Sequence, residues 1–306
     1  MTTAAAERRA CAWLVYTACV WGANVVVLKA MANEFAIVHL SAIRMAVAFV
    51  CIAAICRFTG HRIVRLTRAE IGWLSAAAAL MIYAHQLLLT QGLAWSSATN
   101  GSLALSLNPV LSVLLGAALF GERLSFARVA GVTLGLLGAG VVVLNRSGAE
   151  LHLGGWGDAL LIASMVVYVA AGACIRHAAR RIHPLVIGFY MHLFGTLMLT
   201  VHAAFTPSFW QADAWFPSAG VWLLVLLSAL FSTAIGNLAW NNGISRLGLA
   251  RTSMFINLLP LSGLLAAVGF LHETLHPAHA IGFACVLAGT WLALRDGRAA
   301  PAALSA

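Results

Sequence analysis

Long apolar segments alternate with short polar ones along almost the whole of this chain. A helix needs roughly 20 apolar residues to cross a bilayer core that is about 30 Å thick. Ten segments approach this length, at approximately residues 11–31, 36–56, 70–91, 98–120, 126–145, 157–176, 184–205, 219–240, 248–271 and 278–295. The pattern predicts an all-α integral membrane protein with ten transmembrane helices and short loops.

The composition agrees with a membrane location. Of the 306 residues, 62% are hydrophobic and only 9% are charged, and the mean hydropathy is +0.92. A soluble domain has about 25% charged residues, so lipid must solvate much of this chain. The net charge is +9, but the basic residues stand between apolar segments. We therefore expect membrane lipid around the protein and no nucleic acid as a partner.

The distribution of basic residues predicts the orientation in the membrane. With ten crossings and an inner N-terminus, fifteen arginines fall on the inner side, whereas only Lys29 and Arg146 fall on the outer side. The cytoplasmic loops of membrane proteins are rich in Lys and Arg. We therefore expect both termini in the cytoplasm.

The two halves of the chain resemble each other. A shift of 151 residues places Pro109 on Pro260, Glu122 on Glu273, Gly131 on Gly282 and Gly138 on Gly289, and a shift of 147 places Trp21 on Tyr168. Residues 1–148 and 149–306 are therefore expected to be two repeats of five helices each. Because five is odd, the second repeat is expected to be inverted in the membrane. Inverted repeats around one site near the midplane are a transporter design that works by alternating access.

Several short motifs recur in order along the chain. They are Trp21-Gly22-Ala23-Asn24, Ser41-Ala42-Ile43-Arg44, Ala98-Thr99-Asn100-Gly101-Ser102 with Asn108-Pro109 and Gly121-Glu122-Arg123-Leu124, and the later echo Leu249-Ala250-Arg251-Thr252-Ser253 with Leu259-Pro260 and His272-Glu273-Thr274-Leu275. Together they resemble the EamA family of the drug/metabolite transporter superfamily. The resemblance implies a basket of helices around a central cavity, a bacterial inner-membrane location, and export or exchange of amino acids, nucleosides or similar metabolites. The chain departs from the family at Leu259, where the first half has Asn108, and at Tyr168, where members often have Trp.

Arg44 is a charged residue within the second apolar segment. A charge inside a membrane helix is costly and usually faces a cavity or a partner. It could anchor a carboxylate or phosphate of a substrate. The alternative is a structural arginine that binds carbonyl groups or extends toward the membrane surface.

Polar side chains also occur in the segments 70–91 and 219–240. Unpaired amides are costly in hydrocarbon, so we expect them to point inward, where they bind a substrate or join helices. In the first segment, Tyr83, Gln86 and Thr90 share a helical face. His85 is the best candidate for proton coupling, although a neutral, hydrogen-bonded histidine is the favoured interpretation.

Trp21 and Tyr168 occupy equivalent places and could form aromatic walls or simply pack between helices. Pro109 and Pro260 interrupt their segments and are the expected hinges. The complete set of expected substrate-binding residues is Trp21, Asn24, Arg44, Tyr83, His85, Gln86, Asn108, Tyr168, Asn237, Trp240, Asn241 and Asn257.

These residues favour a secondary transporter or facilitator of a small metabolite. The chain has no Walker motif, and no acidic residue lies in the middle of an apolar segment, which argues against a pump for hydrophobic cations. Efflux of drugs or aromatic cations remains the alternative, followed by an intramembrane enzyme or a scaffold. We expect no catalytic residues, because GxSxG and HExxH are absent, and no metal or cofactor. Monomer and homodimer both stay open.

Overall fold

The computed structural model describes residues 3–32, 36–61, 63–96, 104–121, 125–144, 155–210, 219–263, 265 and 277–295. Almost all of these residues are helical, and the described part of the chain contains no strand. This confirms the prediction of an all-α protein. Glu122 and Glu273, which coincide in the predicted repeat, lie outside the described residues.

The α-helices are α1 (Thr3–Ala32), α2 (Ile37–Phe58), α3 (Arg68–Ala78), α4 (His85–Trp95), α6 (Asn108–Phe120), α7 (Phe126–Leu144), α8 (Trp156–Ala178), α9 (Pro184–Ala204), α10 (Ala219–Leu227), α11 (Gly236–Leu247), α12 (Leu249–Ser253) and α14 (Pro277–Arg295). Two π-helices, η1 (Ala79–Ala84) and η4 (Ser228–Ile235), connect α3 to α4 and α10 to α11. Two 3₁₀ helices complete the described elements, η2 (Pro207–Trp210) and η5 (Met254–Leu258).

Within the part of the chain that the structure describes, five helical stretches are long and apolar enough to cross a membrane. They are Ile37–Phe58, Arg68–Trp95, Trp156–Ala178, Pro184–Ala204 and Ala219–Leu247. Three shorter apolar helices, Ala104–Leu119, Phe126–Val141 and Pro277–Ala293, accompany them. The chain is therefore a multi-pass membrane protein, while the total of ten spans stays a prediction.

Local sequence signals explain where several helices begin and end. Thr67 caps α3, because its hydroxyl accepts from the Glu70 amide while the Glu70 carboxylate accepts from the Thr67 amide. Pro184 stands in the first turn of α9, where its missing N–H costs nothing. Gly121 ends α6 in the left-handed conformation, with φ of 61°.

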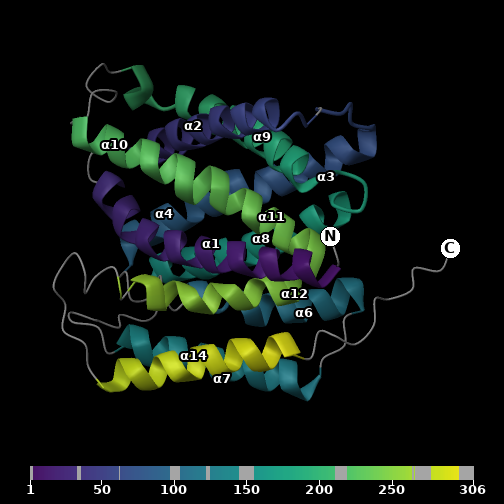
Figure 1. The fold of residues 1–306 in the computed structure, drawn as a ribbon. Coiled ribbons are helices and arrows are strands. Elements are labelled where there is room, and N and C mark those ends of the chain that lie inside the picture. Colours follow the sequence, from purple (N-terminus) through teal and green to yellow (C-terminus); the bar gives the residue numbers. More distant parts are fainter. Residues whose placement is uncertain are drawn as a thin grey trace.

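Helices from the two halves of the sequence pack in pairs (Figure 1). α2 lies beside α9, α4 beside α8, α1 beside α11, and α7 beside α14. Each pair joins one helix from residues 1–148 to one from residues 149–306. The buried core therefore forms where the two halves meet.

The α7–α14 pair is held close by glycines. A Cβ atom on Gly131 would lie 2.6 Å from the Gly289 carbonyl oxygen, and one on Gly138 would lie 2.7 Å from the Gly282 carbonyl oxygen. Both approaches are backbone to backbone, so no larger residue fits without separating the helices. These glycines therefore permit close contact between two helices of the same chain.

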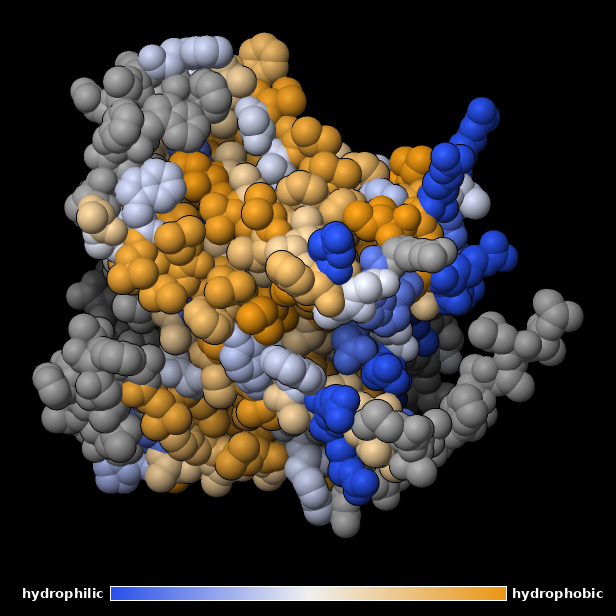
Figure 2. All heavy atoms as spheres, turned by 45° about the horizontal axis from the view of Figure 1, so that its top comes forward, coloured by the Kyte–Doolittle hydropathy of each residue, from blue (hydrophilic) through white to orange (hydrophobic). Residues whose placement is uncertain are grey.

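The surface divides into an apolar body and a basic end (Figure 2). Large apolar side chains such as Val50, Leu137, Val201 and Leu223 are exposed along the helices. The blue side chains gather at one end of the molecule in this view. The exposed arginines are Arg8, Arg9, Arg57, Arg65, Arg68, Arg180, Arg181 and Arg246, and they stand at helix ends or in loops.

Candidate functional site

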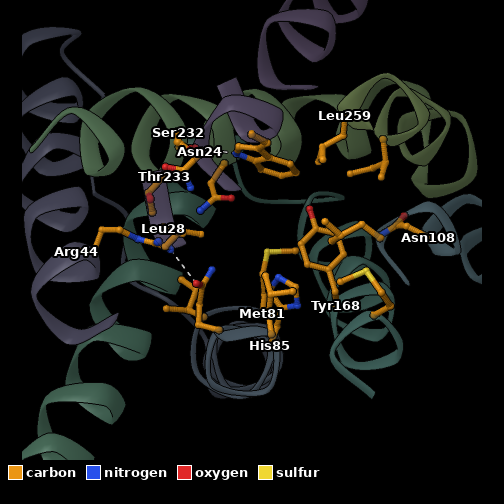
Figure 3. Close-up of a pocket in the computed structure, with 18 of the residues that line it drawn as sticks. Asn24, Leu28, Arg44, Met81, His85, Asn108, Tyr168, Ser232, Thr233 and Leu259 are labelled. Atoms are coloured by element: carbon orange, nitrogen blue, oxygen red, sulfur yellow. Dashed lines mark hydrogen bonds between the residues drawn. The ribbon is translucent and has the colours of Figure 1, made fainter. Parts of the chain in front are cut away.

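A cavity of about 90 Å³ lies where the two halves meet, and helices from both halves line it (Figure 3). Its apolar lining consists of Leu28, Met45, Met81, Ile82, Leu89, Leu105, Met165, Ile256 and Leu259. Its polar and aromatic lining consists of Trp21, Asn24, Arg44, His85, Gln86, Asn108, Tyr168, Ser232, Thr233 and Asn237. Arg44 is the one permanently charged residue in the described lining.

Arg44 supplies the charge at one side of this cavity. It extends from α2, and the residue is only 3% exposed. Its Nη2 donates to the Gln86 Oε1 at 2.8 Å, while its Nε has no hydrogen-bond partner. No described Asp or Glu lines the cavity. An unsatisfied buried donor costs about 1–3 kcal/mol, and more when it is charged, so the guanidinium is left with binding capacity for an anion.

Asn24 lies on the same side and is fixed by the second half. The Ser228 hydroxyl donates to the Asn24 Oδ1 at 2.6 Å. One turn earlier in α1, the Trp21 Nε1 donates to the Ser232 carbonyl at 2.9 Å. Ser228 and Ser232 both belong to η4, so the π-helix positions the cavity face of α1.

An aromatic cluster closes another side of the cavity. The ring centroids of Trp21 and Tyr168 are 6.3 Å apart, those of Trp21 and Trp240 are 5.4 Å apart, and those of Tyr168 and Trp240 are 5.7 Å apart. The Tyr168 hydroxyl is buried without a partner, and Figure 3 shows it pointing into the cavity. Trp240 packs behind the other two rings and does not line the cavity.

His85 is held in one orientation beside Tyr168. Its Nδ1 lies 3.0 Å from the Ser164 carbonyl oxygen, and because a carbonyl can only accept, that nitrogen carries a proton. The rings of His85 and Tyr168 are 4.8 Å apart. The contact links α4 to α8 and fits the interpretation of a hydrogen-bonded histidine, while a role in proton coupling stays a prediction.

The second half contains a polar pair that the sequence did not predict. The Asn237 Nδ2 lies 3.3 Å from the His192 Nε2, and the His192 Nδ1 lies 2.9 Å from the Gly188 carbonyl oxygen. The Nδ1 therefore donates to the carbonyl and the Nε2 accepts from the amide. Nothing in the sequence links these two residues, because they are 45 residues apart along the chain.

Eight of the twelve expected residues line the cavity, and four do not. Tyr83 points toward α9 and its hydroxyl lies 3.1 Å from the His202 Nδ1. Asn241 and Asn257 are fully enclosed, with the Asn241 Oδ1 and both amide atoms of Asn257 unpaired. Sequence reasoning missed Ser232 and Thr233, whose small hydroxyl side chains gave no signal within an apolar segment.

The two prolines stand at equivalent breaks. Pro109 is in the first turn of α6, directly after a turn at Leu107. Pro260 follows the 3₁₀ helix η5. Each helix is thus interrupted just before its proline, next to the lining residues Asn108 and Leu259. Hinge motion there stays a prediction.

Comparisons with known proteins address the family of the chain. The model of the EamA-like transporter family matches it twice, over residues 8–144 and 155–295. A probable terminal-alkyne amino-acid exporter of Streptantibioticus cattleyicolor is 28% identical over 279 residues, which are 91% of this chain and 91% of that protein. The uncharacterized transporter YetK of Bacillus subtilis is 25% identical and matches 89% of this chain and 82% of its own length.

Two further matches agree with these. The aromatic amino acid exporter YddG of Ancylobacter novellus is 30% identical over 58% of this chain and 60% of its own length. A solved crystal structure superposes with a TM-score of 0.76 at 22% identity, covering 93% of this chain and 96% of the other, which shows a shared fold. Relatives named transporters and exporters, rather than enzymes, confirm the expectation that this chain is not an enzyme. The chain is a two-repeat member of the EamA-like transporter family.

Proposed function

We propose that this transporter exports or exchanges a small, amino-acid-like metabolite by alternating access, and that the cavity is its substrate site. The observation that carries the proposal is that both halves contribute polar groups to one cavity at their contact. Arg44 and Gln86 come from the first half, and Ser232, Thr233 and Asn237 come from the second. A site at the contact of two repeats changes its access when the repeats move against each other.

The character of the lining supports an amino-acid-like substrate over a hydrophobic cation. The described lining has a cation, Arg44, and no carboxylate. A cationic drug would meet like charge there, although the Trp21 and Tyr168 rings would suit its aromatic part. The volume of about 90 Å³ is also below the about 300–1,000 Å³ of pockets that hold drug-sized ligands. Two relatives are named amino-acid exporters.

The basic end supports a location with both termini in the cytoplasm of a bacterial cell. Arg57, Arg180, Arg181 and Arg246 are exposed near the C-terminal ends of α2, α8 and α11, and the positive-inside rule assigns a face rich in such residues to the cytoplasm. The substrate would then enter from the basic end for export. The driving force would be the substrate gradient or exchange, with His85 as the group to test for proton coupling.

The test is flux in liposomes that contain the purified protein. Labelled amino acids and nucleosides would be offered with and without a proton gradient. Saturable flux of one class supports the proposal, and acceleration by the gradient assigns proton coupling. Absence of flux for every compound, from a monodisperse sample with known orientation, would contradict it.

A matched pair of variants then tests the site. Asn237 lines the cavity, whereas Asn242 on the same helix does not. The Asn242 Oδ1 instead accepts a hydrogen bond from the Arg246 Nε at 2.9 Å. Asn237→Ala should lower flux about tenfold, because an uncompensated polar partner costs about 1–3 kcal/mol. Asn242→Ala should leave flux within about twofold. Equal effects of the two variants would contradict the site.

A further inference from the structure

Three side chains at the α2 side of the cavity present hydrogen-bond donors, and the amide oxygens of two of them already accept a hydrogen bond. Arg44 has only donors, and its Nη2 is on Gln86 while its Nε has no partner. Because the guanidinium cannot accept, Gln86 must turn its oxygen toward it, which leaves the Gln86 amide nitrogen as a donor. The Asn24 oxygen is likewise occupied by the Ser228 hydroxyl at 2.6 Å, which leaves the Asn24 amide nitrogen.

We infer that this donor cluster of Arg44, Gln86 and Asn24 binds the carboxylate of the transported substrate. The inference rests on the proposed function and names the group of the substrate that this site recognises. A carboxylate offers two oxygens with about four acceptor positions and no donor, so it complements the guanidinium of Arg44 and the amide nitrogens of Gln86 and Asn24, which donate. Figure 3 shows Arg44 and Asn24 reaching the same side of the cavity from α2 and α1.

The charge balance favours a carboxylate over a phosphate. Arg44 is the permanent cation among the described lining residues. One guanidinium neutralises the single charge of a carboxylate, whereas a phosphate with nearly two charges would remain partly uncompensated in a buried site. The planar fork of the guanidinium also matches the planar carboxylate.

The apolar part of the lining accommodates the rest of the substrate. Met81, Met165, Ile256 and Leu259 belong to this part and suit a hydrocarbon or aromatic body. The unpaired Tyr168 hydroxyl points into the cavity there and offers one neutral polar contact. Compounds with a carboxylate at one end and an apolar body should therefore bind.

The experiment measures binding to the purified protein by tryptophan fluorescence, since Trp21 lines the cavity. The probes are leucine and phenylalanine, their carboxamides, the corresponding 2-oxo acids, and inorganic phosphate. The wild-type protein should bind the acids at least about tenfold more tightly than the carboxamides, because a charge-assisted hydrogen bond is lost in the amide. Similar affinity for acids and 2-oxo acids would assign recognition to the carboxylate alone. Equal affinity for acids and carboxamides, or competition by phosphate at the same concentration, would overturn the inference.

Two variants keep the test independent of folding. Arg44→Gln should bind the acids at least about tenfold more weakly than the wild type, while its affinity for the carboxamides, which carry no carboxylate and a positive charge, should not decrease. Arg57→Gln removes an exposed arginine from the end of the same helix and should leave both affinities unchanged. If Arg44→Gln does not purify as a monodisperse protein, the wild-type preference for acids decides alone.

Failure of this inference can be told apart from failure of the proposed function. Saturable flux without a preference for acids over carboxamides would keep the transporter and remove the carboxylate site. Selective binding of acids without flux in liposomes would keep the carboxylate site and contradict transport of those acids.

Discussion

The first half of the chain places a charged pair at the cavity, and the second half places a neutral pair at the corresponding position. Arg44 is the eighth residue of α2 and bonds to Gln86, the second residue of α4. His192 is the ninth residue of α9 and bonds to Asn237, the second residue of α11. Each amide is the second residue after a π-helix, η1 or η4. The comparison teaches that two similar scaffolds can supply one charge and one set of neutral contacts to a shared site.

The corresponding positions also differ in side-chain volume. A shift of 151 residues places His85 on Gly236. A Cβ atom on Gly236 would lie 2.6 Å from the Trp21 Nε1, so only glycine fits beside that indole. The first half thus fills the position with an imidazole, and the second half receives the indole of α1 there. The site is asymmetric although the helices around it are repeated.

The largest expected effect comes from removing the charge in the first half, and its neutral counterpart in the second half serves as the comparison. Arg44→Gln should lower the kcat/KM for a carboxylate substrate at least about tenfold, because a charged hydrogen bond contributes about 1.5–3 kcal/mol. His192→Gln should change it by no more than about threefold, since a neutral amide can still bond to Asn237. Liposome flux measures both. Equal losses would show that the charge of the first half has no special role.

The second prediction concerns Gly236. Gly236→Ala should displace the Trp21 ring, break its hydrogen bond to the Ser232 carbonyl and lower the stability by about 1–3 kcal/mol. Thermal unfolding in detergent checks this. Gly220→Ala is the control, because nothing lies within 4 Å of a Cβ atom at Gly220, and it should unfold at the wild-type temperature or above. An unchanged midpoint for Gly236→Ala would contradict the close packing of Trp21.

The fold followed from the sequence better than the site did. Segment length and apolar content are sufficient to predict membrane helices, and the Gly, Pro and Glu coincidences indicated the repeat. The faces of the helices were harder to predict, because η1 and η4 have more residues per turn than an α-helix. Tyr83 and Gln86 were expected on one face, but Tyr83 contacts His202 on α9 and Gln86 contacts Arg44. Residues such as Ala-Leu-Met-Ile-Tyr-Ala in η1 are ordinary helix formers, so nothing in the sequence marks the π-helix.

Burial limited the prediction in a second way. Asn241 is one turn beyond Asn237 and carries the same side chain, yet it packs in the core and does not line the cavity. Polar residues on inward faces can serve either contacts between helices or a cavity. Spacing along one helix does not distinguish these two cases, because the distinction depends on the neighbouring helices.

The third prediction compares the two amides. Gln86→Leu leaves the Arg44 Nη2 without its acceptor and should raise the KM for a carboxylate about tenfold. Asn237→Leu leaves the neutral His192 Nε2 without its donor and should raise the KM for a carboxylate about threefold. Initial rates of uptake at several substrate concentrations separate KM from kcat. A larger effect at Asn237 would reverse the assignment of the carboxylate to the first half.

The smallest expected effect concerns the pH dependence of stability and arises outside the membrane segments. There His61, which follows α2, contacts His183, which precedes α9. Their ring centroids are 4.5 Å apart. Burial, together with the charges of His61 and Arg246, lowers the pKa of His183 below its usual value of 6.5. The neutral Nδ1 also accepts from the Leu185 amide at 3.3 Å and caps α9.

Because the folded protein holds His183 neutral, its contribution to stability is complete above pH 6.5. It should decrease as the pH falls through 6.5 toward the lower pKa of the folded state. His183→Asn keeps a capping side chain without titrating, so its unfolding midpoint should depend less on pH between 7 and 5. An identical pH dependence in the two proteins would contradict the shift.

The most direct test of the central claim asks whether transport passes through the cavity. The measurement is flux after chemical modification of a single introduced cysteine, in a protein whose six native cysteines are replaced by alanine or serine. Ser232→Cys places the cysteine in the lining of the cavity. Ser245→Cys, the control, places it at an exposed position near the end of α11. We predict that a methanethiosulfonate reagent stops flux through the first variant, that the substrate slows this reaction, and that the labelled second variant transports normally. Undiminished flux through fully labelled Ser232→Cys would contradict the account.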